Sequence, residues 1–382
     1  MLRFLHTADW QLGITRRYLG ADAQARYAQA RLDVIVRMGD LAQARGCAFM
    51  VVAGDVFDSN LVDRQTLLRA LDALARVAVP VLILPGNHDA HDPSSIYRAA
   101  SFLEHRPRHV HLLVGDAATF TGLPDVEVVG VPWTTRKPAH DLVAASLSKL
   151  APPRCLRVVV AHGRTDAFRP ARREAASIGQ AAVEQALQRR LLHYLALGDR
   201  HSFGAVGDSG RVFYAGTPEP TDFDEERPGH AALVEFSSRD APPRVEAVPV
   251  GTWRFLRLEA EVGDGGDVDQ LARALATLPN KERTVVRLDL RGSLDADGWL
   301  QLERHLDAQR DVFAALDRRD GGLTLAADAL TSAAESHLDT RFGLAGWPAE
   351  AARALMARAP REGAARDALL LLHRLTHDAG PQ

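Results

Sequence analysis

The stretch VPVLILPGNHDAHD, residues 79–92, indicates both the fold class and the place of a functional site. Residues 81–84 form an uninterrupted apolar run, which is typical of a strand buried on both faces of a parallel sheet. The chain then turns through a Pro-Gly pair and presents Asn87, His88 and Asp89 in succession. A core strand that ends in an amide, an imidazole and a carboxylate predicts a polar site beyond the carboxyl end of the sheet.

The same arrangement recurs along the first 250 residues. Strand-like runs alternate with helical patterns, such as residues 64–77, whose leucines repeat at helical spacing. Several runs end in side chains that can bind a metal: Asp9, Asp55, Asn87 with His88, His162, and Asp199 with His201. We therefore expect an α/β fold in which these side chains converge on one edge of a sheet.

The predicted edge is rich in oxygen donors. Asp, Asn and His are hard or borderline ligands that suit Mn²⁺, Mg²⁺, iron or Zn²⁺ better than soft, sulfur-preferring metals. Each residue alone has a structural explanation, because an Asp often caps a turn and a histidine can be a hydrogen-bonded core residue. The set as a whole favours a metal site. Glycines beside its members would let the backbone pack closely there: Gly54, Gly86, Gly163 and Gly198.

Composition excludes several other classes of protein. The chain has 382 residues, 46% hydrophobic and 25% charged, which is enough for a large core and more than one domain. No apolar run reaches the roughly 18 residues that cross a bilayer, so we expect no membrane partner, and the polar start predicts a cytoplasmic protein. The 2 cysteines lie in apolar runs, which argues against disulfides and sulfur-based metal sites. Because the formal net charge is −3, binding of a polyanion has to come from local arginines or from metal ions.

Three domains are predicted. Residues 1–240 would form the α/β domain, and the proline-rich stretch 237–251 is interpreted as a linker or an edge strand. Residues 250–325, which include a helix-like segment at 297–318, would form a small α+β accessory or cap domain. An alanine-rich helical tail is expected at 340–382.

Several segments taken together resemble the calcineurin-like metallophosphoesterases, and among them the DNA-repair nuclease subunits of the SbcD type. They are HTADWQLG at 6–13, GDVFD at 54–58, PGNHD at 85–89, AHG at 161–163, GDRH at 198–201 and YAGTPEPTDFDEERPGH at 214–230. The resemblance covers about the first 235 residues. It implies a four-layer αββα sandwich, a site for two divalent metal ions and hydrolysis of phosphoester bonds.

The resemblance also assigns ligands residue by residue. The first metal would be held by Asp9, Gln11, Asp55 and His201, and the second, bridged by Asp55, by Asn87, His162 and Asp199. Nuclease members have histidine where this chain has Gln11 and Asp199. A glutamine ligates only through its carbonyl oxygen, so we expect weaker binding of the first metal, whereas the charge of Asp199 makes the second site harder. The same two residues occur in a bacterial branch, called MPE, that the resemblance associates with manganese-dependent cleavage of single-stranded DNA.

Further roles are predicted around the ligands. His88 is placed to give a proton to the leaving oxygen, and Asp89 or another carboxylate would fix its orientation. Trp10 and Phe203 flank ligands, and packing of the site wall is favoured over stacking on bases. Arginines after the strand that ends at His162 are candidate contacts to DNA phosphates, with a solvated helix face as the alternative: Arg164, Arg169, Arg172 and Arg173.

Together these features predict a phosphodiesterase that cleaves single-stranded or branched DNA in repair, with two divalent metal ions that are most suitably Mn²⁺. We favour an endonuclease over a duplex exonuclease. The C-terminal helix would pack on its own domain or, as in SbcD-type nucleases, on a partner ATPase, and other repair enzymes are further candidate partners. The sequence leaves two alternatives: a phosphoesterase for a small molecule, nucleotide or phosphoprotein, and a catalytically inactive DNA-binding scaffold.

Overall fold

The computed structural model divides the chain into two compact units. It describes residues 1–115, 118–168, 174–325 and 347–358, together with Glu362, Ala364, Ala365, Ala368 and Leu371. Unit 1 comprises Met1–Arg17 and Gln24–Arg254, and unit 2 comprises Tyr18–Ala23 and Phe255–Gln382. Among the described helices none is both long enough and apolar enough to cross a membrane.

Unit 1 contains two six-stranded sheets. The first has the order β12-β11-β1-β2-β3-β4, with β1 to β4 parallel and β11 and β12 antiparallel at one side. Its strands are β1 (Leu2–Thr7), β2 (Met50–Ala53), β3 (Val81–Leu84), β4 (Val110–Leu112), β11 (His230–Phe236) and β12 (Arg244–Pro249). The stretch 237–251 therefore contains an edge strand, β12.

The second sheet has the order β5-β6-β7-β8-β10-β9. Strands β6, β7, β8 and β10 are parallel, and β5 and β9 pair antiparallel at the two edges. Its strands are β5 (Ala118–Leu123), β6 (Val126–Val131), β7 (Leu156–His162), β8 (Tyr194–Gly198), β9 (Gly204–Ala205) and β10 (Val212–Tyr214). All side chains of β7 and β8 are buried, as expected for central strands covered on both faces.

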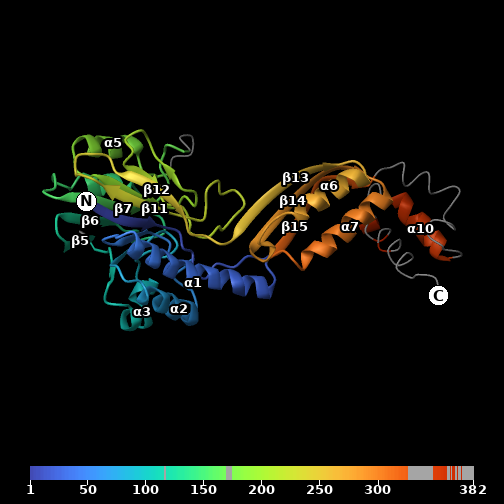
Figure 1. Ribbon diagram of the computed structural model, residues 1–382, viewed down its shortest axis with the longest axis horizontal. Helices are drawn as coiled ribbons and strands as arrows, with labels where there is room; N and C mark the ends of the chain where they lie inside the picture. Colours follow the sequence, from blue (N-terminus) through green and yellow to red (C-terminus); the bar gives the residue numbers. More distant parts are fainter. Residues whose placement is uncertain are drawn as a thin grey trace. The chain divides into compact units, whose positions relative to one another are not determined.

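Helices cover the outer faces of the two sheets (Figure 1). The first sheet is covered by α1 (Ala21–Ala44) and α2 (Arg64–Ala75), with η1 (Ile96–Arg98) and α3 (Ala100–His105) beside them. The second is covered by α4 (Leu142–Leu147) and α5 (Gln180–Gln188). A separate core cluster lies between the sheets and joins Phe4 and Leu82 of the first sheet to Val158 and Ala196 of the second. The predicted four-layer αββα sandwich is confirmed.

Helix α2 shows how local sequence selects local structure. Leu67, Leu71 and Leu74 are buried on one face, as the helical spacing predicts. The Asp63 side chain accepts a hydrogen bond from the backbone N–H of Thr66, which satisfies a donor that the first turn leaves unpaired. The helix ends at Ala75, two residues before the predicted end, and β3 follows it.

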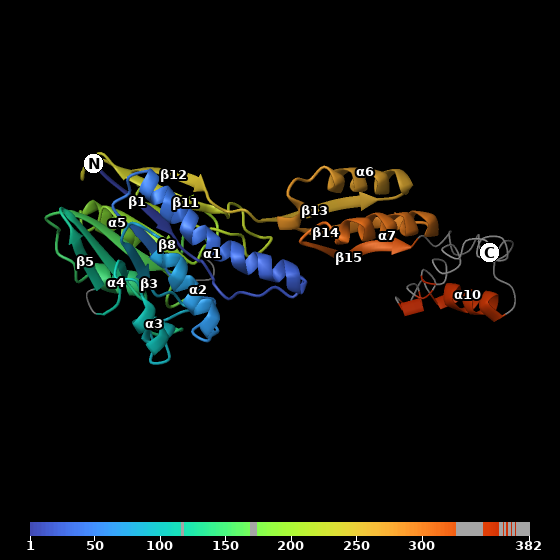
Figure 2. The ribbon, with the colours of Figure 1, turned by 60° about the horizontal axis from the view of Figure 1, so that its bottom comes forward.

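Unit 2 is built on one three-stranded sheet in the order β13-β14-β15 (Figure 2). Its elements are β13 (Arg254–Val262), α6 (Gly265–Ala276), η3 (Lys281–Arg283), β14 (Thr284–Leu294), α7 (Ala296–Arg310) and β15 (Ala315–Leu325). The segment 297–318 is helical only to Arg310, because Ala315 and its successors pair in parallel with β14. Of the predicted tail, α10 (Trp347–Arg358) is a described helix, whereas most of residues 359–382 lie outside the described part.

Candidate metal centre

The carboxyl ends of five strands deliver polar side chains to one place in unit 1. Asp9 follows β1, Asp55 follows β2, Asn87 follows β3, His162 ends β7 and Asp199 follows β8. Three of these strands belong to the first sheet and two to the second. The site therefore lies where the two sheets of the sandwich meet, at the position that the strand-end pattern predicts.

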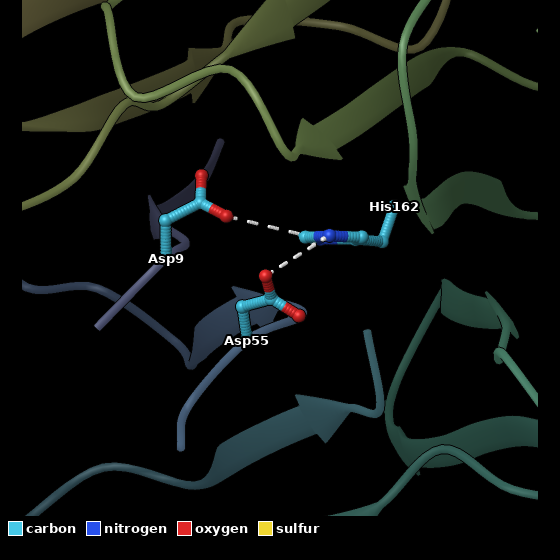
Figure 3. A group of neighbouring side chains, drawn as sticks. All are labelled: Asp9, Asp55 and His162. Atoms are coloured by element: carbon cyan, nitrogen blue, oxygen red, sulfur yellow. Dashed lines mark ion pairs between the residues drawn. The ribbon is translucent and has the colours of Figure 1, made fainter. Parts of the chain in front are cut away.

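Asp9, Asp55 and His162 form the centre of this group (Figure 3). One ligand atom from each lies within 4.8 Å of the others. His162 Nε2 is 3.5 Å from Asp55 Oδ2, and His162 Nδ1 is 3.9 Å from Asp9 Oδ1. All three residues are buried, and Figure 3 shows their side chains pointing toward one another. Two carboxylates and an imidazole in this arrangement are a suitable donor set for a divalent cation.

Four residues of the site adopt a left-handed backbone that is uncommon outside glycine. The φ angles are 54° at Asp9, 48° at Gln11, 54° at Asp55 and 93° at Asp199. Backbone N–H groups hold the first loop in place, since Asp9 N donates to Gly54 O and Gln11 N donates to Asp55 O. Strained conformations of this kind persist where the surrounding structure over-determines them, and they are concentrated at functional sites.

Glycines make room for the converging side chains. A Cβ on Gly54 would lie 2.2 Å from His162 Nδ1, and one on Gly198 would lie 1.9 Å from the carbonyl oxygen of Ala53. A Cβ on Gly86 would lie 2.2 Å from Asp55 Oδ1. These distances are far below van der Waals contact, so the close approach of the strand ends requires glycine at these positions.

The histidine at the end of β7 carries a fixed proton on Nδ1. Its Nδ1 lies 2.8 Å from the carbonyl oxygen of Ala53, and because a carbonyl can only accept, the proton resides on Nδ1. Nε2 points at two oxygens that can only accept, Asn87 Oδ1 at 2.7 Å and Asp55 Oδ2 at 3.5 Å, so it shares a proton with them unless a cation takes its place. Trp133 Nε1 donates to the His162 carbonyl oxygen at 2.7 Å and packs edge-on against the ring. His162 is thus prepared to ligate through Nε2.

His88 lies on the same loop as Asn87. Its backbone N–H donates to Asp55 Oδ1 at 3.0 Å, and its Nδ1 donates to the backbone carbonyl of Asp58 at 2.7 Å. This second hydrogen bond places the proton on Nδ1 and leaves Nε2 for exchange with a substrate. The imidazole is half-buried.

Asp89 has a different role from the one expected. Its carboxylate is fully buried and accepts hydrogen bonds from Gly86 N, Phe57 N and the Tyr97 hydroxyl at 2.7, 3.1 and 2.5 Å. These donors hold the turn after β3 onto the loop after β2. The orientation of His88 is set by the Asp58 carbonyl instead, which corrects the expectation that Asp89 or another carboxylate orients the imidazole.

The two unusual residues, Gln11 and Asp199, both contact the central group. Gln11 is buried and its amide nitrogen donates to Asp55 Oδ2 at 3.2 Å, so its side chain reaches the central group. The backbone N–H of Asp199 donates to both oxygens of Asp9, and its side-chain Oδ1 lies 3.8 Å from His162 Nε2. Its other oxygen, Oδ2, pairs with Arg164 Nε at 3.1 Å. Arg164 thus partly offsets the added negative charge.

His201 is half-buried and lies outside the three-residue central group. Its Nδ1 contacts the Thr221 hydroxyl and a carboxylate oxygen of Glu225. Glu225 was missed in the sequence because it stands among other acidic residues in TDFDEE, and nothing in that run distinguishes one acid from another.

Burial determines the electrostatics of the carboxylates. It raises the pKa of Asp9 to about 7, and burial together with the charge of Asp55 raises the pKa of Asp89 to about 6. Burial lowers the pKa of His162, but the neighbouring carboxylates, Asp55 first, raise it well above its usual value. Among the described residues no lysine or arginine pairs with Asp9 or Asp55. The donor set therefore fits a cation, which would supply the missing positive charge.

Aromatic side chains near the ligands divide into two kinds. Trp10 is 1% exposed and its indole N–H donates to the Thr7 hydroxyl, and Phe203 packs against Phe213. Both side chains therefore pack in the wall of the site, which the sequence favoured over stacking on bases. Phe168, which the sequence did not single out, is 45% exposed and has the Arg200 guanidinium 4.1 Å from its ring centre. Arg169, Arg172 and Arg173 lie outside the described residues.

A comparison with protein families decides the relationship. The calcineurin-like phosphoesterase family matches residues 2–203, which is more than half of the chain. The chain belongs to the calcineurin-like phosphoesterase family. As a member of this family it is a metal-dependent hydrolase of phosphoester bonds, and the resemblance to the calcineurin-like metallophosphoesterases is confirmed.

Curated relatives extend the similarity toward nucleases. This calcineurin-like phosphoesterase is 33% identical over 116 residues to the SbcD subunit of the nuclease SbcCD from Bacillus subtilis, an alignment of 29% of the chain and 27% of the relative. It is 25% identical over 275 residues to the protein of the same name in Escherichia coli K12, covering 62% of the chain and 66% of the relative. The chain thus spans about a quarter of the first relative and just under two thirds of the second.

Two solved structures are also similar. A dimetal phosphatase from Danio rerio matches with a TM-score of 0.39 and 15% identity, covering 65% of the chain and 96% of that structure. A protein of Thermus thermophilus matches with a TM-score of 0.39 and 12% identity, covering 65% of the chain and 99% of that structure.

Proposed function

We propose that this phosphoesterase is a manganese-dependent nuclease that cleaves single-stranded DNA. The observation that carries the proposal is the convergence of Asp9, Asp55 and His162 with His88 held beside them. The two curated relatives are named as subunits of a nuclease, which supports a nucleic acid as the substrate. The cytoplasm is the location we propose.

The ligands divide into two sets that share Asp55. Asp9, Gln11, Asp55 and His201 would hold the first cation, and Asp55, Asn87, His162 and Asp199 the second. Divalent cations, when bound, supply polarisation of the phosphoryl oxygens and a water nucleophile near neutral pH. Mn²⁺ suits this mixture of oxygen and imidazole donors.

His88 is the proposed catalytic residue of the chain itself. The Asp58 carbonyl holds its Nδ1–H, so Nε2 is the ring atom that remains to exchange a proton. A proton carried at Nε2 would pass to the leaving oxygen as the phosphodiester bond breaks. The neighbouring Asn87 would bind the second cation without transferring a proton, because an amide does not titrate. Its Oδ1 contacts His162 Nε2.

Exposed groups at the site suit a single strand. Phe168 is 45% exposed, and the Arg200 guanidinium, which also pairs with Glu226, lies 4.1 Å from its ring centre. An exposed aromatic ring beside a cation is the kind of surface on which unstacked bases pack in single-strand binding proteins. Arg164, whose side chain is 69% exposed, adds a positive charge beside Asp199. A duplex offers no free base faces to such a surface, so these groups favour single-stranded over double-stranded DNA.

Cleavage assays with a covalently closed single-stranded circle test the proposal. The chain with Mn²⁺ is expected to convert the circle to linear strands, which requires an internal cut, and His88→Ala is expected to lower the rate by about 100-fold or more. His105→Ala is the matched control, because His105 is exposed on α3 and its Nδ1 contacts the Ser101 carbonyl of the same helix. A chain that hydrolyses p-nitrophenyl phosphate but leaves the circle intact would contradict the nuclease and support a small-molecule phosphoesterase.

A further inference from the structure

His201 is held by a buried carboxylate. Glu225 Oε1 lies 2.8 Å from His201 Nδ1, and the Glu225 side chain is 7% exposed. Its second oxygen, Oε2, accepts from the Thr221 backbone N–H at 2.9 Å, and the Thr221 hydroxyl contacts both Oε1 and His201 Nδ1. Both oxygens of the carboxylate are therefore fixed in place.

This arrangement determines the tautomer of His201. A carboxylate can only accept, so Nδ1 carries the proton and donates it to Glu225. The lone pair is then left on Nε2, which is the ring atom that remains to bind a cation. The Thr221 hydroxyl lies in the same contact and narrows the range of ring orientations.

The two histidines of the site have different partners. His162 donates from Nδ1 to a neutral backbone carbonyl, that of Ala53, whereas His201 donates to a charged group. A charged acceptor forms the stronger hydrogen bond and makes the opposite nitrogen a better donor to a metal. In the proposed ligand set the histidine with the stronger partner, His201, belongs to the first cation, to which Gln11 would offer only an amide oxygen.

We propose that Glu225 is a positioning residue that fixes His201 with Nε2 as the donor atom and thereby maintains affinity for the first cation. The inference rests on the proposed metal centre and on the contacts of Glu225, Thr221 and His201. In this role Glu225 contacts neither the substrate nor the cation. It acts on the affinity for the cation by orienting the His201 imidazole.

The deciding measurement is Mn²⁺ binding to the full chain, followed by the electron paramagnetic resonance of free Mn²⁺. Glu225→Gln keeps the shape of the side chain but removes the charge, and it is expected to weaken the first site by about 10-fold to 100-fold. Glu226→Gln is the matched control, because this neighbouring side chain is 75% exposed and pairs with Arg200 at the surface. The Mn²⁺ affinity of this control is expected to stay within about twofold of the parent.

A double-mutant cycle separates positioning from a general structural effect. If Glu225 acts through His201, Glu225→Gln adds little further loss of Mn²⁺ affinity in a His201→Gln background. Thr221→Val is a second, milder variant that keeps Glu225, and it is expected to weaken the same site by a smaller factor.

The outcomes are distinguishable. Parent-like Mn²⁺ affinity in folded Glu225→Gln, or fully additive losses in the cycle, overturn the role of Glu225 and leave the metal centre intact. A parent chain that binds no Mn²⁺ overturns the metal centre itself, and this inference with it. If Glu225→Gln does not fold, undiminished affinity in Thr221→Val overturns the inference.

Discussion

A single methyl group at position 86 is expected to disable the metal centre. In Gly86→Ala the new Cβ would lie 2.6 Å from the backbone nitrogen of Asp55 and 2.2 Å from its Oδ1. Gly86 does not have a positive φ angle, so alanine is compatible with its backbone and the perturbation is purely steric. The atoms that must yield belong to the residue proposed to bridge both cations.

The size of the effect follows from the distances. The contact to the Asp55 nitrogen is about 0.8 Å shorter than the 3.4 Å at which ordinary contact begins. The nitrogen has little freedom to retreat, because Asp55 has a φ angle of 54° and its carbonyl accepts from Gln11 N. A displacement of this order is expected to cost about 1 to 3 kcal/mol of folding stability. It is also expected to cost about 100-fold in any property that depends on placement of the carboxylate.

The assay combines urea unfolding with Mn²⁺ titration. Gly86→Ala should remain folded with a lower unfolding midpoint and bind Mn²⁺ about 100-fold more weakly. Gly20→Ala is the control, since a Cβ at Gly20 meets nothing within 4 Å. Undiminished Mn²⁺ affinity in folded Gly86→Ala would refute the claim that the packing of this turn positions Asp55.

Three further predictions concern acid stability, substrate binding and metal preference. Burial lowers the pKa of His6 to about 3, so below about pH 6.5 the unfolded chain binds more protons than the folded one and stability falls as the pH drops. In His6→Gln the loss of unfolding free energy between pH 6 and 5, measured by urea unfolding, should be smaller by about 1 kcal/mol per pH unit. An unchanged dependence of the unfolding free energy on pH would contradict this prediction. Phe168→Ala should lower the affinity for a labelled single strand by about fivefold or more, measured by fluorescence anisotropy in EDTA, and should have little effect on the affinity for an abasic strand. Equal losses of affinity for both strands would exclude base stacking on this ring. Asp199→His should bring the cleavage rates with saturating Mn²⁺ and Mg²⁺ closer together, because it removes a carboxylate charge from one cation site. An unaltered ratio of the two rates would show that Asp199 does not determine the preference for Mn²⁺.

The sandwich was predictable because its strands are short, apolar and followed by polar residues. The run 81–84 became β3 as expected, and the leucine spacing after Asp63 located α2 to within two residues at its end. Periodicity also misled in one place. The apolar spacing at 297–318 resembles a helix throughout, but pairing with β14 turns residues from Ala315 onward into a strand.

The contacts that support the site were less predictable than its polar side chains. Asp89 follows the proposed ligand Asn87 by two residues, whereas Glu225 lies 24 residues beyond His201. Only the fold shows that Asp89 binds backbone N–H groups while Glu225 binds His201. Likewise the orientation of His88 depends on the Asp58 carbonyl, a group that every residue possesses and that carries no sequence signal.

The left-handed backbone at Asp9, Gln11, Asp55 and Asp199 has a consequence for protein engineering. Glycine at any of these positions would relieve roughly 1 kcal/mol of steric strain, so a library screened only for heat tolerance will enrich glycine at the catalytic rim. The most thermostable clones of such a screen would be the ones that had lost their chemistry, and the screen would have to select for turnover at the same time.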